Sequence, residues 1–121
     1  MAPVLVTQAL AGLLRAAKKA RVVNMTSWVG SIGDKDMPGY YGYSASKAAL
    51  NMLTRLCALD LKRDRVIVAA IHPGWVRTDM GGPNAPLSPE KSVRKLLATV
   101  DALTTRQSGL FLNVDGRELN W

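Results

Sequence analysis

Apolar residues recur along the chain at two alternating kinds of spacing, which predict helices separated by short buried strands. In three segments the apolar positions repeat with the period of a helix, and between these segments lie short runs that are apolar or β-branched without polar alternation. The predicted helices are 3–19, 43–62 and 88–103, and the predicted strands are 22–26, 66–71 and 110–114. Glycine- and proline-containing loops are predicted at 28–42 and 75–87, and Ser88 followed by Pro89 is a favourable helix start.

This order of elements predicts an α/β fold. Strands that are apolar on both faces and separated by long helices form parallel βαβ units with right-handed crossovers. Ligands of such sheets bind beyond the carboxyl ends of the strands. Ser27 and the loop that begins at Pro73 follow two of these ends, so we expect them on the same edge of the sheet.

The bulk properties limit the classes of protein and partner. A chain of 121 residues is one domain at most, and its single cysteine, Cys57, excludes an internal disulfide. The net charge of +7 raises the question of nucleic acid, but no aromatic residues interleave with the basic groups and no nucleic-acid-binding motif accompanies them. There is no apolar run of the ~20 residues that a membrane span requires and no signal peptide. We therefore expect a soluble, cytoplasmic protein that binds neither nucleic acid nor membranes, and we single out no metal ligands.

Tyr43 and Lys47 are the candidates for chemistry on the central helix. Positions i and i+4 share a helix face, so the phenol and the ammonium group can point at the same site. A nearby cation favours the phenolate, which makes Tyr43 a plausible proton donor or acceptor for a carbonyl and alcohol pair. Ser27, at the end of a strand, is placed to hydrogen-bond the same oxygen.

Three segments carry more specific motifs. They are Val23-Asn24-Met25-Thr26-Ser27-x-x-Gly30, Tyr43-Ser44-Ala45-Ser46-Lys47, and His72-Pro73-Gly74-Trp75-Val76-Arg77-Thr78-Asp79-Met80. In this order and spacing they resemble successive motifs of the short-chain dehydrogenase/reductase family, and the segments 78–82 and 108–121 resemble its C-factor-like, carbonyl-reductase-like branch. The resemblance covers essentially the whole chain, and it corresponds to the C-terminal half of a family member.

The resemblance implies an NAD(P)H-dependent carbonyl reductase or alcohol dehydrogenase. By it, Ser27 steadies the substrate oxygen, Tyr43 exchanges the proton, and Lys47 promotes ionisation of the phenol and holds the nicotinamide ribose. The resemblance also assigns contacts with the nicotinamide end to Pro73, Gly74, Val76 and Thr78. The substrate expected on this basis is a small apolar carbonyl compound, and Trp75 and Met80 are expected to wall its pocket.

The chain departs from the family in one respect. Family members begin with a strand and a glycine-rich turn that holds the pyrophosphate, and no Gly-x-x-x-Gly-x-Gly segment occurs here. We therefore expect half of a Rossmann-like, doubly wound parallel sheet, with about three strands and without the nucleotide-binding half. The choice between NAD and NADP stays open. Without that half, the strand at 22–26 lacks a neighbouring strand on one side, so we expect a homodimer or higher oligomer that covers this edge. Subunits of the family commonly pair through the two helices that correspond to 3–19 and 43–62.

Two alternatives remain at this point. One is a remnant of the family that folds but has no activity. The other is a cofactor-independent, esterase-like serine hydrolase in the same cleft, because Gly42-Tyr43-Ser44-Ala45-Ser46 approximates Gly-x-Ser-x-Gly and Ser44-Ala45-Ser46-Lys47 has Ser-x-x-Lys spacing. In that reading Ser27 or Ser44 is acylated with Tyr43 or Lys47 as base, and His72 is a turn residue rather than a triad member.

Overall fold

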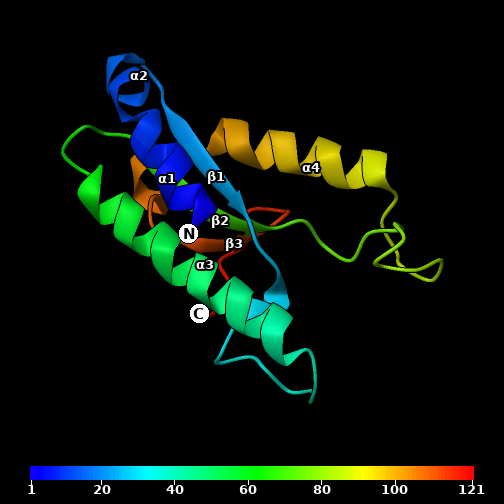
Figure 1. Cartoon of the computed structure of the whole chain (residues 1–121). Coiled ribbons are helices and arrows are strands. Elements are labelled where there is room, and N and C mark those ends of the chain that lie inside the picture. The colour runs from blue at the N-terminus through cyan, green and yellow to red at the C-terminus, as the bar shows by residue number, and fades with distance from the viewer.

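The computed structural model describes residues 1–121 and contains a three-stranded parallel sheet (Figure 1). The strands are β1 (Arg21–Met25), β2 (Ile67–His72) and β3 (Phe111–Asn113), arranged side by side in that order. The helix α3 (Tyr41–Asp60) joins β1 to β2, and α4 (Pro89–Ala102) joins β2 to β3. The predicted α/β class, with half of a Rossmann-like sheet, is confirmed.

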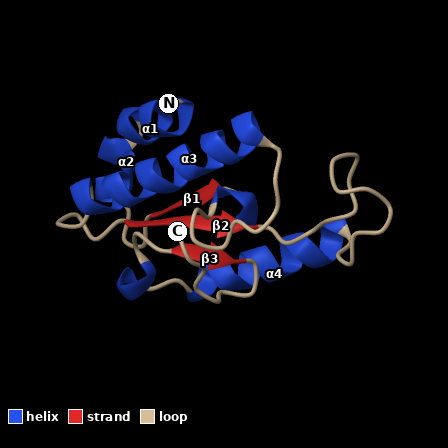
Figure 2. Cartoon of the chain, turned by 90° about the horizontal axis from the view of Figure 1, so that it is seen from below, coloured by secondary structure: helices blue, strands red, loops and turns tan.

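Helices cover both faces of the sheet, as Figure 2 shows, with α3 on one face and α4 on the other. Val68 of β2 packs with Cys57 and Ala58 of α3 in one apolar cluster. Ile67, Ala69 and Ile71 point to the opposite face, where they form a second cluster with Leu103 and Leu112. Burial of a side chain of this size stabilises a fold by about 1.5–3 kcal/mol, so the central strand β2 anchors both layers.

The predicted helix at 3–19 is wrong as a single element. The chain forms α1 (Ala2–Ala9) and α2 (Ala11–Ala16), which meet at Leu10, and Ala17 is already extended. Leu10 provides no side-chain cap for α2, and Gly12 within this short helix has low helix propensity. The apolar residues keep their regular helical spacing across this break, so the spacing alone does not reveal it.

Two further details differ from the predicted boundaries. Short 3₁₀ turns, η1 (Trp28–Gly30) and η2 (Thr105–Gln107), lie in segments that were predicted as loop or left between elements. Helix α3 begins at Tyr41 rather than Tyr43, so Tyr43 lies inside its first turn. The predicted start of α4 is confirmed, because the Ser88 hydroxyl accepts a hydrogen bond from the Lys91 amide at 3.3 Å and Pro89 is the first helical residue.

Some apolar surface is left uncovered in the single chain. β1 pairs only with β2, so its other edge is open. Side chains on α1 and α3 that are about half exposed include Leu5, Val6, Met52, Leu56 and Leu59. None of the helices combines the length and the apolar character needed to cross a membrane.

Candidate active site

Ser27 lies at the carboxyl edge of the sheet, directly after β1. Its hydroxyl accepts a hydrogen bond from the Val29 amide at 3.4 Å, which caps the turn η1. The residue is 9 % exposed. Ser27 thus lies beyond a strand end, as the sequence predicted, and the hydrogen bond from the Val29 amide orients its side chain.

Lys47 links this strand end to Tyr43. The Lys47 Nζ atom donates a hydrogen bond to the Met25 carbonyl, the last of β1, at 3.1 Å. The same atom lies 5.6 Å from the centroid of the Tyr43 ring, within cation–π range. Tyr43 is 36 % exposed, so it remains open to a ligand. The sequence-predicted trio Ser27, Tyr43 and Lys47 therefore comes from one strand end and the first two turns of one helix.

A glycine allows η1 to approach α3 closely. A Cβ atom on Gly30 would lie 2.8 Å from both the carbonyl carbon and the Cβ of Lys47. Real Cβ atoms essentially never approach neighbours this closely. The backbone that carries Ser27 therefore contacts the helix directly at the turn that carries Lys47.

The second loop of the site follows β2 at the same edge. The Pro73 carbonyl accepts a hydrogen bond from the Ser92 hydroxyl at 2.7 Å, which attaches the loop to α4. Gly74 has a φ of +85°, a conformation that favours glycine. Val76 forms a β-bridge with Leu87, and this bridge closes the loop on itself. All four residues predicted to contact a nicotinamide thus lie on one loop beside the end of β2.

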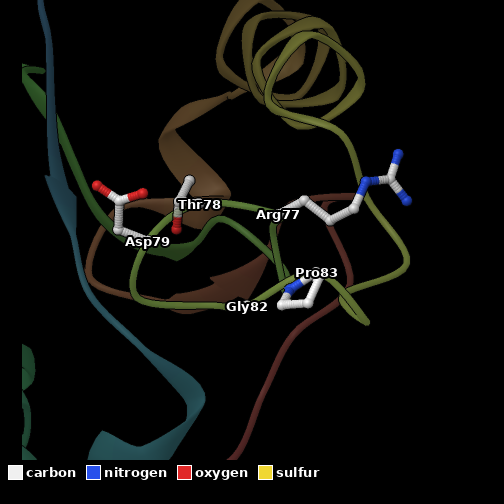
Figure 3. Close-up of a pocket in the computed structure, with 5 residues that line it drawn as sticks. All are labelled: Arg77, Thr78, Asp79, Gly82 and Pro83. Atoms are coloured by element: carbon white, nitrogen blue, oxygen red, sulfur yellow. The ribbon is translucent and has the colours of Figure 1, made fainter.

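Thr78 lies in an open cavity of about 360 Å³, shown in Figure 3. Arg77, Asp79, Gly82 and Pro83 complete its lining. Thr78 and Asp79 lie on one side of the loop, and the Arg77 guanidinium points away from them. None of these five residues is hydrophobic.

The apolar pocket wall expected from Trp75 and Met80 is not formed. Met80 is 83 % exposed, and the Trp75 Nε1 atom donates a hydrogen bond to the Gly81 carbonyl at 2.7 Å. Neither side chain lines the cavity around Thr78. This hydrogen bond joins Trp75 to a residue six positions later in the loop and so restrains the loop conformation.

His72 and Ser44, which figure in the hydrolase alternative, have no catalytic partners. Burial lowers the pKa of His72 to about 4, and its Nδ1 atom is buried without a hydrogen-bond partner. The Ser44 hydroxyl is likewise buried with no partner. A serine nucleophile needs a base within hydrogen-bonding distance, and the structure provides none for Ser44.

The partly buried His72 predicts a loss of stability in acid. Its pKa is about 4 in the folded chain and 6.5 when solvated, so between these values the unfolded chain binds more protons. Stability therefore falls as the pH is lowered from 6.5 to 4, by about 2 kcal/mol once the partial exposure of the ring is allowed for. Urea midpoints measured across this range for the wild type and His72→Gln should show the steeper acid loss in the wild type. Equal slopes for the two proteins would contradict this.

Sequence reasoning missed two polar clusters near the site. Asn51, one turn after Lys47 on the same face of α3, is buried and hydrogen-bonded to Thr26. Lys35 places its Nζ atom 5.9 Å from the ring centroid of Trp28 and 6.0 Å from that of Tyr40. The i+4 spacing from Lys47 was a signal for Asn51, whereas no local pattern indicated the contacts of Lys35.

Two comparisons of sequence agree with this geometry. The family described as short chain dehydrogenase matches residues 1–87. The C-signal of Myxococcus xanthus is 41 % identical over 121 residues, which cover all of this chain and 73 % of that protein. The 1-hydroxy-2-glutathionyl-2-methyl-3-butene dehydrogenase of Rhodococcus sp. (strain AD45) is 38 % identical over 125 residues, which cover 54 % of its length.

Solved structures give the same result. The carbonyl reductase Sniffer of D. melanogaster superposes with a TM-score of 0.93 at 35 % identity, covering 98 % of this chain and 52 % of that one. An NADPH-bound carbonyl reductase from chicken fatty liver superposes with a TM-score of 0.92 at 36 % identity, and the match covers 99 % of this chain and 53 % of that one. The chain thus spans about half the length of these reductases. With more than half of its own length matched by the family, it belongs to the short-chain dehydrogenase family.

Proposed function

We propose that the chain is the catalytic half of an NAD(P)H-dependent carbonyl reductase or alcohol dehydrogenase. The observation that carries this proposal is the arrangement of Ser27, Tyr43 and Lys47, in which the Lys47 ammonium group contacts both the end of β1 and the Tyr43 ring. The carbonyl reductases among the structural relatives support the same reaction class.

Tyr43, Ser27 and Lys47 have different roles in the proposed acid–base chemistry. The Tyr43 hydroxyl gives its proton to the carbonyl oxygen during reduction and takes it back from the alcohol during oxidation. The Ser27 hydroxyl donates a hydrogen bond to the same oxygen as negative charge develops there. Lys47 places a positive charge beside the phenol ring, where it stabilises the phenolate left after proton transfer. The dinucleotide supplies the hydride when it is bound.

The residues present fit one end of a dinucleotide. The open cavity around Thr78 lies beyond β2, on the edge of the sheet that also carries Ser27. Because this cavity adjoins the loop of Pro73, Gly74 and Val76, we place the nicotinamide end there. The 121 residues contain no Gly-x-x-x-Gly-x-Gly segment for the pyrophosphate, so both NAD and NADP remain candidates.

Self-association is the second part of the proposal. The open edge of β1 presents unpaired backbone groups, and half-exposed leucine, valine and methionine side chains lie on α1 and α3. A free strand edge can pair with strands of another chain, and exposed apolar side chains favour contact with another surface. A homodimer or higher oligomer that covers them is therefore part of this proposal.

Titration with NADPH and NADH tests the proposal when nucleotide fluorescence and light scattering are followed together. Saturable binding in the micromolar range by an oligomer is the expected result. A monomer that binds neither nucleotide at millimolar concentration would contradict both parts. Turnover of simple esters without nucleotide would instead favour the hydrolase alternative, for which no base contacts Ser44.

A further inference from the structure

We propose that Asn51 is a positioning residue that holds Ser27 in register with Tyr43 and Lys47. The inference rests on the proposed function, because it assigns a role within the same site. Its basis is that the buried side-chain amide of Asn51 forms hydrogen bonds with residues on both sides of Ser27.

The contacts of Asn51 lie on both sides of Ser27 in the chain. Its Oδ1 atom accepts a hydrogen bond from the Thr26 hydroxyl at 2.8 Å, and its Nδ2 atom donates to the Gly30 carbonyl at 3.4 Å. Thr26 precedes Ser27, and Gly30 ends the 3₁₀ turn that Ser27 caps. The amide group thus fixes both ends of η1.

Burial makes these contacts hard to replace. Asn51 is 2 % exposed and Thr26 is 3 % exposed, so water does not substitute for a lost partner. A buried polar group that loses its partner keeps the cost of its desolvation. The pair therefore favours one arrangement of η1 against α3 over displaced ones.

The helix transmits this constraint to the other two candidate residues. Tyr43, Lys47 and Asn51 follow one another at intervals of four along α3 and so lie on one face of it. Figure 1 shows η1 against the N-terminal half of α3, and the close approach of Gly30 to Lys47 brings the two backbones into contact. A shift of η1 would move the Ser27 hydroxyl relative to Tyr43, since Ser27 caps η1 and Tyr43 belongs to α3.

A second bond across the same strand–helix interface provides a matched control. The Asn24 Nδ2 atom donates to the Thr54 hydroxyl at 2.9 Å. Thr54 is fully buried and lies on the turn after Asn51, farther from the site. Thr26→Val and Thr54→Val each delete one buried hydroxyl that bonds an asparagine, with little change in shape. The Thr54 hydroxyl also donates to the Leu50 carbonyl within α3 at 2.8 Å, so Thr54→Val removes at least as many hydrogen bonds as Thr26→Val.

The first test compares steady-state reduction of a carbonyl substrate by these two variants. We expect Thr26→Val to lower kcat by about 10- to 100-fold with little change in the KM for the nucleotide, because a misplacement of about 1 Å costs this much. Thr26→Ser, which keeps the hydroxyl, should restore kcat. Thr54→Val should lower the melting temperature about as much as Thr26→Val does while leaving kcat within about twofold. Equal kcat values for both valine variants would overturn the proposal.

A second measurement does not depend on turnover. Trp28 directly follows Ser27, so the ¹⁹F resonance of 5-fluorotryptophan at this position reports the placement of η1. We expect Thr26→Val and Asn51→Leu to shift that resonance and Thr54→Val to leave it unchanged. An unshifted Trp28 resonance in Thr26→Val would refute the positioning role even in a folded chain. If the wild-type chain transferred no hydride, the proposed function would fail while this resonance still decided whether Asn51 holds the turn.

Discussion

Tyr43→Phe is expected to lower kcat for carbonyl reduction by about 10³-fold while the chain stays folded. The substitution removes only the hydroxyl, and a positioned proton donor contributes about 10²- to 10⁴-fold to such a rate. Tyr43 is 36 % exposed and its hydroxyl has no protein partner that folding requires, so the melting temperature should change little. Steady-state kinetics with a saturating carbonyl substrate and NADPH measures the loss.

Ser44→Ala is the control for this result. Ser44 is the neighbour of Tyr43 that figures in the hydrolase alternative, and its hydroxyl is buried without a partner. Its removal should leave carbonyl reduction within about twofold of the wild type, because the proposed reaction does not use it. A Tyr43→Phe variant with full reductase activity would show that the proton comes from another group.

Gly30→Ala is expected to disrupt the contact between η1 and α3. The added methyl group would lie 2.8 Å from two atoms of Lys47, one of them in the backbone of α3, so either η1 or the helix must shift. Inserting a methyl group into such a contact costs about 1–3 kcal/mol, and we expect the upper part of this range because a helix backbone does not yield. Denaturant unfolding measures the stability, and kcat should fall as well, because the shift separates Ser27 from Lys47.

Gly12→Ala separates this steric effect from a general effect of replacing glycine. Gly12 lies within α2, and no atom lies within 4 Å of the position that its Cβ would take. Alanine is favoured over glycine in a helix by about 0.5–1 kcal/mol, so this variant should be slightly more stable than the wild type. If Gly30→Ala were as well tolerated as Gly12→Ala, the close contact between η1 and α3 would not exist in solution.

The regular elements were predictable because single patterns determine them. Residues 66–71 are uniformly apolar and rich in β-branched side chains, which is typical of a strand covered on both faces, and β2 is such a strand. The neighbourhood of Tyr43 and Lys47 followed from the i, i+4 geometry of one helix. The position of Ser27 followed from the rule that ligands lie beyond the ends of parallel strands.

Other features depended on contacts that no local pattern records. Residues 3–19 keep a helical spacing across Leu10, although the chain forms two short helices that meet there. The bond between Thr26 and Asn51 joins residues 25 positions apart, and nothing in either segment specifies the other. Trp75 was expected in a pocket wall, but its indole found a carbonyl acceptor six residues away. Tertiary hydrogen bonds of this kind decide the details of the site.

Transfer of deuterium from NADPH that carries deuterium at both C4 positions tests the central claim most directly. The purified chain is incubated with the labelled nucleotide and an aromatic or aliphatic ketone, and the alcohol is analysed by mass spectrometry. The account predicts one deuterium on the carbinol carbon of the product from the wild type and a loss of about 10³-fold in its rate of formation in Tyr43→Phe. Unlabelled alcohol, or labelled alcohol formed equally fast by both proteins, would contradict the assignment of this site to hydride-coupled proton transfer.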